Sequence, residues 1–442
     1  MRIALPKQVE QIIRVLEENG FEAFAVGGCV RDSILGRQPS DWDVTTSALP
    51  EQVKALFRKT VDTGIRHGTV TVLLDGAGYE VTTYRIDGDY RDGRHPSEVY
   101  FTRNLEEDLK RRDFTINAMA YNDRAGLVDR FGGEEDLKSG MIRCVGSAGE
   151  RFEEDALRIL RAVRFSAQLG FSIEEETKKA AAALAPSLER ISQERIQTEL
   201  VKLLVSDHPE YLKTAWELGI TRAVLPEFDA MMETPQNGGY HSYNVGEHTL
   251  KALEVVRPER ILRLTVLLHD CGKPMVRSTD EDGRDHFYGH GDVSAQMALE
   301  ILKRLRFDND TIRKVRTLIR FHDWRPLPTE RAVRRMAGRI GEELFLLLLE
   351  VKRADEAAKA PERRKEALEA VDELETLYRS IQERGDCLSL KKLAVNGQDL
   401  IADGMRPGKK LGEVLNALLA DVLDEPSHNT KEKLLEQSRS LR

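Results

Sequence analysis

The stretch FAVGGCVRDSILGRQPSDWDVTT, residues 24–46, combines a short apolar run, a double glycine, an Arg-Asp pair and two aspartates separated by one tryptophan. The run FAV predicts a buried strand, and WDVTT predicts a second strand of β-branched residues. Side chains alternate along a strand, so Asp41 and Asp43 would lie on one face about 6 to 7 Å apart. Two neighbouring carboxylates require a counter-charge, which hard divalent cations such as Mg²⁺ supply. The stretch therefore predicts a sheet that carries a magnesium site.

Further groups near this stretch fit the same chemistry. Glu80, in the β-rich run YEVTTYR, is the best candidate for a third carboxylate from a neighbouring strand. Gly27 and Gly28 follow the first strand directly and lack Cβ atoms, so backbone N–H groups there can approach phosphate oxygens closely. Arg31 adds a fixed positive charge. A pair of magnesium ions held by the carboxylates would bind a triphosphate and activate an attacking hydroxyl group.

The composition is that of a soluble globular protein of several domains. At 442 residues the chain is too long for one ordinary core, and hydrophobic residues make up 40% of it. Its longest apolar runs, LFLLLL and LTVLL, are far shorter than the roughly 20 residues that cross a bilayer, so no membrane span is expected. The four cysteines lie far apart with no C-x-x-C pair, which favours a reducing cytoplasm. With a net charge of −8, nucleic acid would have to bind local basic patches.

The predicted secondary structure changes along the chain. Runs of β-branched and aromatic residues predict a mixed sheet with helices up to about residue 145, and helical periodicity dominates afterwards. A Pro- and Gly-containing break at 225–243 and a second break near RGDCLSLKK divide the helical part. The predicted fold class is therefore α+β. Its expected domains are a mixed-sheet head (1–145), a helical neck and body (146–225), a histidine-rich helical domain (226–385) and a helical tail (386–442).

The arrangement G-G-x-V-R-D followed by D-x-D resembles that of the DNA polymerase beta-like nucleotidyltransferases. More specifically, it is similar to bacterial class II tRNA nucleotidyltransferases and poly(A) polymerases, and the tail segment LAVNGQDLI (393–401) resembles that of CCA-adding members. Four more segments match in the expected order: EEDLKRRDFTINAMAYN (106–122), DRFGGEEDLKSGMIR (129–143), RFEEDALRILRAVRF (151–165) and ISQERIQTELVKLL (191–204). The resemblance implies a catalytic, polymerase-beta-like head with Mg²⁺ and a neck and body that select the base and bind RNA. It also implies the tRNA 3′ end, ATP and CTP as partners.

The segment RRDFTINAMA predicts a site that recognises ribose. Arg112 can hold a phosphate or a sugar oxygen, while Asp113 and Asn117 can hydrogen-bond the 2′-hydroxyl group that distinguishes ribonucleotides. Judged alone, the segment fits a helix start capped by Asp113 equally well. Beside the family motifs, ribose recognition is favoured, and Gly28 and Arg31 are further expected nucleotide-binding residues.

The run EEDALRILRAVRF predicts a helix that selects the base. Its charged residues recur every three positions, opposite a cluster of apolar side chains; they are Asp155, Arg158, Arg161 and Arg164. Cytosine and adenine share an amino donor beside a ring-nitrogen acceptor, which a carboxylate and a guanidinium can match. Asp155 with Arg158 would thus select CTP and ATP, as the family's E-D-x-x-R motif implies, and the other two arginines would face the triphosphate. A solvated helix face with i,i+3 ion pairs is the alternative.

A second set of chemically active residues lies in the helical part. Six of the ten histidines fall within residues 241–322. The predicted ligands are His248, His269, Asp270, His290, His322 and Asp355. Their order resembles that of the HD phosphohydrolase superfamily. This implies a divalent ion (Mn²⁺, Ni²⁺, Fe²⁺ or Mg²⁺) that makes a hydroxide able to attack phosphate esters. Structural histidines in a helical bundle are the alternative, and catalysis at such a site is left open.

Together the motifs predict a template-independent RNA nucleotidyltransferase that adds or repairs the 3′-terminal CCA of tRNA and releases pyrophosphate. A poly(A) polymerase, or an enzyme that adds only A or only CC, would share every catalytic motif and is the alternative within the family. The alternative from a different class is a phosphohydrolase of the HD type with an RNA-binding first part. The segment at 86–100 is expected to be either a lid beside the site or an ordinary surface loop. The tail is expected to bind tRNA, and the oligomeric state is left open.

Overall fold

The computed structural model describes residues 2–88, 99–237 and 243–441. The chain forms two compact units, Met1–Pro226 and Glu227–Arg442. The first unit holds a seven-stranded sheet, and the described part of the second is helical apart from one two-stranded ribbon, β12 (Ser278–Thr279) with β13 (Asp285–His286). A mixed sheet with helices followed by a largely helical body confirms the predicted α+β class. The finer division into four domains stays a prediction.

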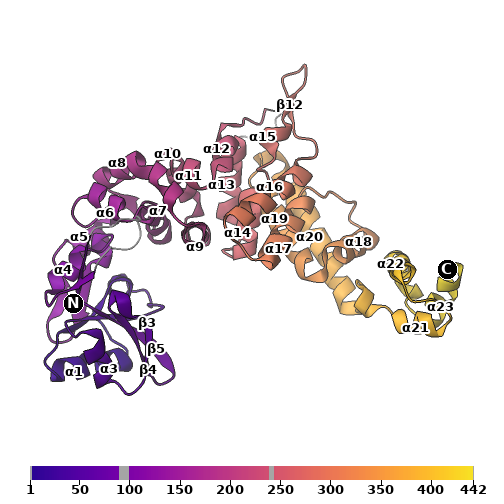
Figure 1. Cartoon of the computed structure of the whole chain (residues 1–442). Coiled ribbons are helices and arrows are strands. Elements are labelled where there is room, and N and C mark those ends of the chain that lie inside the picture. The colour runs from indigo at the N-terminus through magenta and orange to yellow at the C-terminus, as the bar shows by residue number, and fades with distance from the viewer. Residues whose placement is uncertain (1, 89–98, 238–242, 442) are drawn as a thin grey trace. The chain divides into compact units, whose positions relative to one another are not determined.

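A mixed sheet forms the base of the first unit (Figure 1). Its order is β3-β4-β5-β2-β1-β8-β9, in which β2 and β5 are parallel and the other neighbours are antiparallel. Strands β1 and β8 are buried at every residue, which fits their place inside the sheet. The strands are β1 (Ala23–Val26), β2 (Asp43–Thr46), β3 (Thr60–Gly64), β4 (Thr69–Leu74), β5 (Ala77–Thr83), β8 (Met119–Asn122) and β9 (Gly126–Asp129). Two short pairs lie beside it: β6 (Arg85–Asp87) with β7 (Val99–Phe101), and β10 (Met141–Ile142) with β11 (Ser172–Ile173).

Helix α1 (Lys7–Glu18) packs on this sheet because its apolar residues repeat at helical spacing. The buried stripe consists of Val9, Ile12, Ile13 and Leu16. Other helices of the head connect or flank the strands, and they place the motifs at the strand ends. They are α2 (Gly28–Ile34), α3 (Pro50–Leu56), α4 (Leu105–Lys110) and α5 (Gly133–Ser139).

The predicted base-selecting helix is broken at Asp155. Helix α6 (Ala148–Glu154) ends there, and α7 (Leu157–Leu169) begins two residues later. Asp155 is extended, with φ −144° and ψ 100°, and its Oδ1 accepts a hydrogen bond of 3.1 Å from the backbone N–H of Leu157. A carboxylate that bonds the first backbone donors of a helix competes with helical continuation through its own residue. The expectation of one continuous helix is therefore wrong at this residue.

The remaining helices of the first unit follow in chain order. They are α8 (Glu175–Leu184), α9 (Gln193–Leu204), α10 (Leu212–Glu217) and α11 (Ile220–Val224). The first unit ends at the first residue of α12 (Pro226–Glu233), and the rest of that helix belongs to the second unit. Helices α7 and α9 pack against each other. This contact brings the motif at 191–204 to the base-selecting segment.

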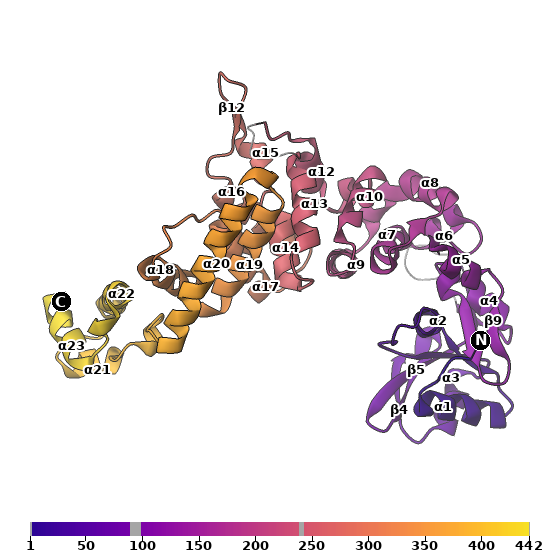
Figure 2. The ribbon, with the colours of Figure 1, turned by 180° about the vertical axis from the view of Figure 1, so that it is seen from behind.

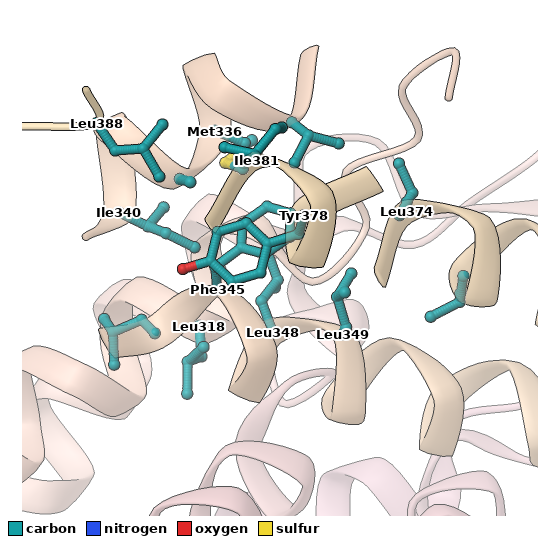
Figure 3. Close-up of a cluster of buried hydrophobic side chains, with 14 of the residues drawn as sticks. Leu318, Met336, Ile340, Phe345, Leu348, Leu349, Leu374, Tyr378, Ile381 and Leu388 are labelled. Carbon is teal, nitrogen blue, oxygen red and sulfur yellow. The ribbon is translucent and has the colours of Figure 1, made fainter. Parts of the chain in front are cut away.

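Two buried apolar clusters lie in the described part of the second unit. In the larger one (Figure 3), Phe345 packs on Tyr378 with ring centroids 4.4 Å apart, and the Tyr378 hydroxyl donates to the Glu342 carbonyl at 3.1 Å. Figure 2 shows α19 beside α20, which supply much of this cluster. The helices are α13 (Val245–Val255), α14 (Arg260–Leu268), α15 (Lys273–Val276), α16 (His290–Arg304), α17 (Asn309–Phe321), α18 (Glu330–Ile340), α19 (Glu342–Ala357) and α20 (Pro361–Arg384).

The smaller cluster belongs to the last segment of the chain. Leu400, Leu418, Val422 and Leu434 are buried there, so this segment has an apolar core of its own. Its helices are α21 (Gly397–Ala402), α22 (Lys409–Asp424) and α23 (Lys431–Ser440). Among the described residues, no helix is long and apolar enough to pass through a membrane.

Candidate active site and metal centre

Three carboxylates meet where β2 and β5 run side by side. Asp43 begins β2, and the register that pairs Val44 with Val81 places Asp43 level with Glu80. Asp41 precedes the strand by two residues. Although Asp43 reaches solvent, the surrounding protein removes part of its hydration. This effect and the charges of Asp41 and Glu80 raise its pKa to about 6. Oxygen ligands that repel one another in this way fit hard divalent ions such as Mg²⁺.

Arg112 lies beside the turn that follows β1. Gly27 has a φ of 82°, and a Cβ atom there would lie 3.0 Å from Arg112 Nη1. A larger residue would be strained and would displace the guanidinium. Gly28 opens α2, and its Cβ position is 3.7 Å from Arg31 Nη2. The charge of Arg112 opposes the rise in the pKa of Asp43, so the turn and the acids share one electrostatic environment.

Asp108 is a buried residue of this site that the sequence prediction missed. Its carboxylate accepts hydrogen bonds from Thr45 Oγ1 at 3.1 Å and from Arg111 Nε at 2.9 Å, and it lies 3.6 Å from Arg112 Nη2. Because Thr45 belongs to β2, this one carboxylate fixes the arginines of the RRDF segment relative to the acidic strand. Its spacing of three and four residues before the two arginines on a helical turn was the available signal.

The residues expected to recognise ribose form a continuous chain of hydrogen bonds. Arg31 Nη1 donates to Asn117 Oδ1 at 2.8 Å, and Asn117 Nδ2 donates to Asp113 Oδ1 at 3.1 Å. Arg161 Nε then donates to Asp113 Oδ2 at 2.9 Å. Burial alone would raise the pKa of Asp113, but the Arg161 guanidinium holds it well below the usual range. Asp113 is therefore a charged, buried link between the head and α7.

The expected base-selecting pair is held by other residues. Asp155 is bound through both oxygens by Arg195, with Nη2 to Oδ2 at 2.7 Å and Nη1 to Oδ1 at 3.2 Å. Arg158 donates to Glu154 Oε2 at 2.6 Å and to the Arg111 carbonyl at 3.0 Å. Each side chain is thus oriented by other residues and not by its partner in the pair, and the contact of the pair with a base stays a prediction.

Arg164 is the most enclosed of the predicted triphosphate ligands. It is 5% exposed, and its Nε donates to Glu199 Oε2 at 2.7 Å, while Nη1 donates to Gln168 Oε1 at 3.0 Å. Arg161 is less enclosed and lies 3.6 Å from the same glutamate. Both arginines therefore have acidic partners inside the protein, and their contact with phosphate stays a prediction. Of the expected lid, residues 89–98 lie outside the described part, and its flanks pair as β6 and β7.

The six predicted ligands of the second unit come together from five helices or helix ends. His248 lies in α13, His269 and His322 follow α14 and α17, His290 opens α16, and Asp355 lies in α19. They form two groups whose ligand atoms lie within 4.8 Å of one another: His248, His269, Asp270 and Asp355, and then Asp270, His290 and His322. Asp270 belongs to both groups, so the cluster fits a centre for two ions.

The histidine rings are oriented by backbone carbonyls. The Nδ1 atoms of His269 and His322 lie 2.6 Å from the carbonyl oxygens of Val266 and Ile319, and His290 Nδ1 lies 2.9 Å from that of Phe287. A proton on Nδ1 leaves Nε2 as the ligand atom. His290 Nε2 and His322 Nε2 lie 3.4 and 3.7 Å from Asp270 Oδ1. The donors therefore point towards the shared carboxylate, as ligands of one centre do.

Two lysines balance the acids of this cluster, one buried (Lys273) and one half-buried (Lys359), and the sequence prediction missed both. Lys273 Nζ lies 2.7 Å from Asp270 Oδ2, and Lys359 Nζ lies 2.7 Å from Asp355 Oδ2. Burial opposes protonation of His269, but the charges of Asp270 and Asp355 prevail and raise its pKa to about 10. A divalent ion would replace this proton and these cations as the counter-charge. A pocket of about 510 Å³ opens beside the cluster.

Three family models match the chain. The "Poly A polymerase head domain" matches residues 23–143, which include the three carboxylates, and the "Probable RNA and SrmB-binding site of polymerase A" matches 170–232. The model of tRNA nucleotidyltransferase domain 2 matches 289–437. The CCA-adding enzyme of Latilactobacillus sakei is 38% identical over 433 residues, which are 97% of this chain and 96% of that enzyme. The chain belongs to the class II family of CCA-adding enzymes and poly(A) polymerases.

Other members of the family are also similar to this chain in sequence or structure. The CCA-adding enzyme of Ligilactobacillus salivarius is 35% identical over 446 residues, 99% of this chain and 98% of that enzyme. The enzyme of Leuconostoc mesenteroides is 57% identical over 196 residues, 44% of this chain, and this alignment spans about half (49%) of that enzyme. The crystal structure of the Bacillus stearothermophilus CCA-adding enzyme in complex with CTP has a TM-score of 0.74 at 32% identity, covering 99% of both chains.

A Thermotoga maritima CCA-adding enzyme complexed with tRNA shares the fold, with a TM-score of 0.58, 23% identity and full coverage of both chains. The likeness to the family's solved structures extends over the whole chain, whereas the matched model of domain 2 begins at residue 289. His248, His269 and Asp270 precede that residue. Metal binding by the histidine cluster therefore depends on its geometry rather than on the family match.

Proposed function

We propose that the protein adds the nucleotides C, C and A to the 3′ end of tRNA, with CTP and ATP as substrates. The supporting observation is the alignment of nearly the whole chain with CCA-adding enzymes, together with the three neighbouring acids on or next to the adjacent strands β2 and β5. The Bacillus stearothermophilus relative is described in complex with CTP, and the Thermotoga maritima relative in complex with tRNA.

In the proposed reaction the primer 3′-hydroxyl attacks the α-phosphorus of the nucleotide in line, and pyrophosphate leaves. Asp41 and Asp43 would hold magnesium, and Glu80 orients the hydroxyl group. When bound, Mg²⁺ supplies the charge that lowers the pKa of this hydroxyl and neutralises the departing pyrophosphate. Asp108 supports Arg112 beside Gly27, where the backbone and the guanidinium receive the phosphates.

The remaining nucleotide-binding residues are proposed to define which nucleotide is accepted. Asp113 and Asn117, braced by Arg31 and Arg161, surround the ribose. Asp155 accepts from the exocyclic amino group shared by cytosine and adenine, while Arg158 donates to the ring nitrogen. Arg195 holds the carboxylate of Asp155 by two hydrogen bonds, which fixes its direction. Uracil and guanine would leave these groups unpaired, and that mismatch costs binding energy.

The test uses purified protein, transcripts of tRNA ending before, within and after the CCA, and one labelled nucleotide at a time. For a CCA-adding enzyme, labelled CTP should add two C residues to the shortest transcript, and labelled ATP should add one A to the transcript that ends in CC. The transcript with the complete CCA should not be extended. Incorporation of A alone on every transcript identifies a poly(A) polymerase, whereas one A on the transcript that ends in CC, with no C on the shorter ones, identifies an A-adding enzyme. Addition of C alone identifies a CC-adding enzyme.

We also propose that the histidine cluster is a second, hydrolytic centre for phosphate esters. The supporting observation is that Asp270 is shared by two ligand groups, at the floor of a pocket whose lining includes Lys273, Lys359, Arg284 and Arg325. Imidazole and carboxylate ligands suit Mn²⁺, Ni²⁺ or Fe²⁺, which make hydroxide available at neutral pH. Metal analysis of the purified protein, and phosphate release from simple phosphate monoesters with each ion, test this function. Equal metal content in wild-type and His269→Ala protein would disprove it.

A further inference from the structure

The aromatic ring of Phe165 contacts three of the arginines that are expected to bind the nucleotide. The guanidinium carbon of Arg164 lies 3.4 Å from the centre of this ring, and those of Arg31 and Arg161 lie 5.1 and 5.3 Å from it. A guanidinium over an aromatic ring is attracted by the negative face of the ring. Arg31 belongs to α2 and the other two arginines belong to α7, so the ring joins cations from two helices that are far apart in the sequence.

The ring is itself held in place by the surrounding protein. Phe165 is 5% exposed, and its ring packs edge to face on that of Phe114, with centroids 5.7 Å apart and planes at 80°. Phe114 is fully buried, and its backbone N–H donates to Asp113 Oδ1 at 2.9 Å. The ring is therefore fixed against the RRDF segment, next to the residues expected to recognise ribose.

The hydrogen bonds of the three arginines fix only part of their orientation. Arg164 Nε donates to Glu199 Oε2 at 2.7 Å, and Arg161 Nη1 lies 3.6 Å from Oε1 of the same glutamate. Arg31 Nη1 donates to Asn117 Oδ1 at 2.8 Å. Bonds to the edge of a guanidinium set its direction within its own plane, but they leave the plane free to tilt. A ring against the guanidinium restricts this tilt, so the polar partners and the ring together define the orientation.

An aromatic ring suits this position better than another acid would. Each of the three arginines already donates to a carboxylate, and these acceptors are Asp32, Asp113 and Glu199. A further carboxylate would give the group an excess of negative charge and repel a triphosphate. A phenyl ring attracts cations through its quadrupole and carries no net charge. Phe165 therefore holds the arginines without opposing an anionic ligand.

We infer that Phe165 is a positioning residue for nucleotide binding, whose ring holds the three arginines in the orientation that receives a nucleoside triphosphate. The inference rests on the nucleotide addition proposed above and adds a residue to which that proposal gives no role. Ribose and triphosphate, which these arginines are expected to meet, are the same in CTP, ATP and UTP. Loss of the ring should therefore weaken the binding of CTP and ATP alike and leave the preference for CTP over UTP unchanged.

The first experiment measures the binding of CTP and of ATP to the full chain by titration calorimetry, with Mg²⁺ and without tRNA. Phe165→Leu keeps an apolar side chain but loses the aromatic face, so Kd should rise about tenfold for both nucleotides, equivalent to about 1.4 kcal/mol. With tRNA present, KM should rise by the same factor while kcat changes by less than about twofold, because these contacts form before the reaction and persist through it. Phe57→Leu changes a buried phenylalanine at the end of α3, serves as the matched control and should keep the wild-type Kd.

A second experiment changes the charge distribution of the ring and keeps its shape. Phe165 is replaced by phenylalanines that carry one, two or three fluorine atoms on the ring, which withdraw electron density from its face. The Kd of both nucleotides should rise with each added fluorine, a trend that core packing alone would not produce. These variants also decide the question if Phe165→Leu does not fold. No such trend, equal Kd values in Phe165→Leu and Phe57→Leu, or a changed preference for CTP over UTP would overturn the inference.

The outcomes separate this inference from the proposed function. If the protein binds nucleotides but adds none to tRNA, the proposed CCA addition fails, while the trend in Kd still decides the role of Phe165. If the wild-type protein binds neither CTP nor ATP, both are overturned. If it adds nucleotides and Phe165→Leu does so with unchanged KM, only the role of Phe165 is overturned.

Discussion

The two candidate metal sites of this protein are built in opposite ways. In the first unit, Asp41, Asp43 and Glu80 are exposed acids on or next to the adjacent strands β2 and β5. Partial loss of hydration, together with the charges of the other two acids, raises the pKa of Asp43. In the second unit, His269 and Asp270 are each 1% exposed, and lysines already balance the acids. At an exposed acidic site, metal ions can bind and leave with each nucleotide. At a buried cluster of imidazoles and carboxylates, a metal ion can bind only when it displaces protons and the charges of nearby lysines. The comparison suggests a transient ion partner for the head and a resident one for the cluster.

The strongest test of this comparison is Asp43→Asn. We expect nucleotide addition to fall about a thousandfold or more, because several kcal/mol of charge stabilisation in the transition state are lost. Steady-state incorporation of labelled CTP measures the effect. Asp75→Asn changes an exposed aspartate of the same unit and should keep wild-type activity. The metal content of the buried cluster should not change, and a loss there would mean that the two sites are coupled.

The reciprocal test is Asp270→Asn. This change removes charge from both ligand groups, so we expect two ions to be lost and phosphate ester hydrolysis to fall about a hundredfold or more, while CCA addition continues. His290→Ala reaches only one group and should remove a single ion. Metal analysis after dialysis measures both. Equal losses from the two variants would contradict a shared carboxylate and favour a centre with one ion.

A smaller effect sharpens the account of the head. Asp155→Ala should lower the preference for CTP over UTP by about tenfold or more, since one buried charge-assisted hydrogen bond is removed. Arg195→Lys keeps the positive charge but loses the two-point hold on Asp155, so its loss of preference should be smaller. The ratio of kcat/KM values for CTP and UTP is the measurement. Unchanged selectivity in Asp155→Ala would assign base recognition to other residues.

The smallest expected effect concerns the helix that ends at His322. Asp308 accepts hydrogen bonds from the N–H and Oγ1 of Thr311 at the start of α17, and these bonds lower its pKa to about 2. Asp308→Ala should reduce the free energy of unfolding by about 1 kcal/mol at pH 7. A carboxylate whose pKa is lower in the folded than in the unfolded protein stabilises the fold at pH values above its unfolded pKa, about 3.9. This contribution disappears as the pH falls towards the folded pKa of about 2. Urea denaturation at pH 7 and pH 3 should therefore show a smaller deficit at pH 3.

The sequence predicted the parts of the fold that follow from periodicity and from motif order. The change from a mixed sheet to helices was visible in the spacing of apolar residues and is confirmed. The break at Asp155 was not, because an aspartate within an apolar-periodic run reads as a surface residue until its hydrogen bond to Leu157 is seen. The family match supports the overall activity, while the roles of individual residues stay predictions.

The sequence also could not predict hydrogen-bond and ion-pair partners that are far apart along the chain. Thr45 and Asp108 are 63 residues apart, so no local pattern joins them. Lys359 lies one helical turn after Asp355 and was open to prediction, but a lysine on a helix usually faces solvent. Buried charged side chains find their partners through the tertiary structure. These partners determine how each predicted ligand is oriented and how far it is enclosed.

Asp270 offers one oxygen to each half of the histidine cluster: Oδ2 lies 3.2 Å from His269 Nε2, and Oδ1 lies 3.4 Å from His290 Nε2. Such a divided ligand makes occupancy a sequence of unequal steps, because a second cation arrives against the field of the first. Hydrolysis that needs both ions would then begin only above a threshold of metal supply. Nucleotide addition, which uses the separate and exposed acids of the first unit, would continue below that threshold. A shortage of the metal bound by the histidine cluster would therefore stop hydrolysis before it affected nucleotide addition.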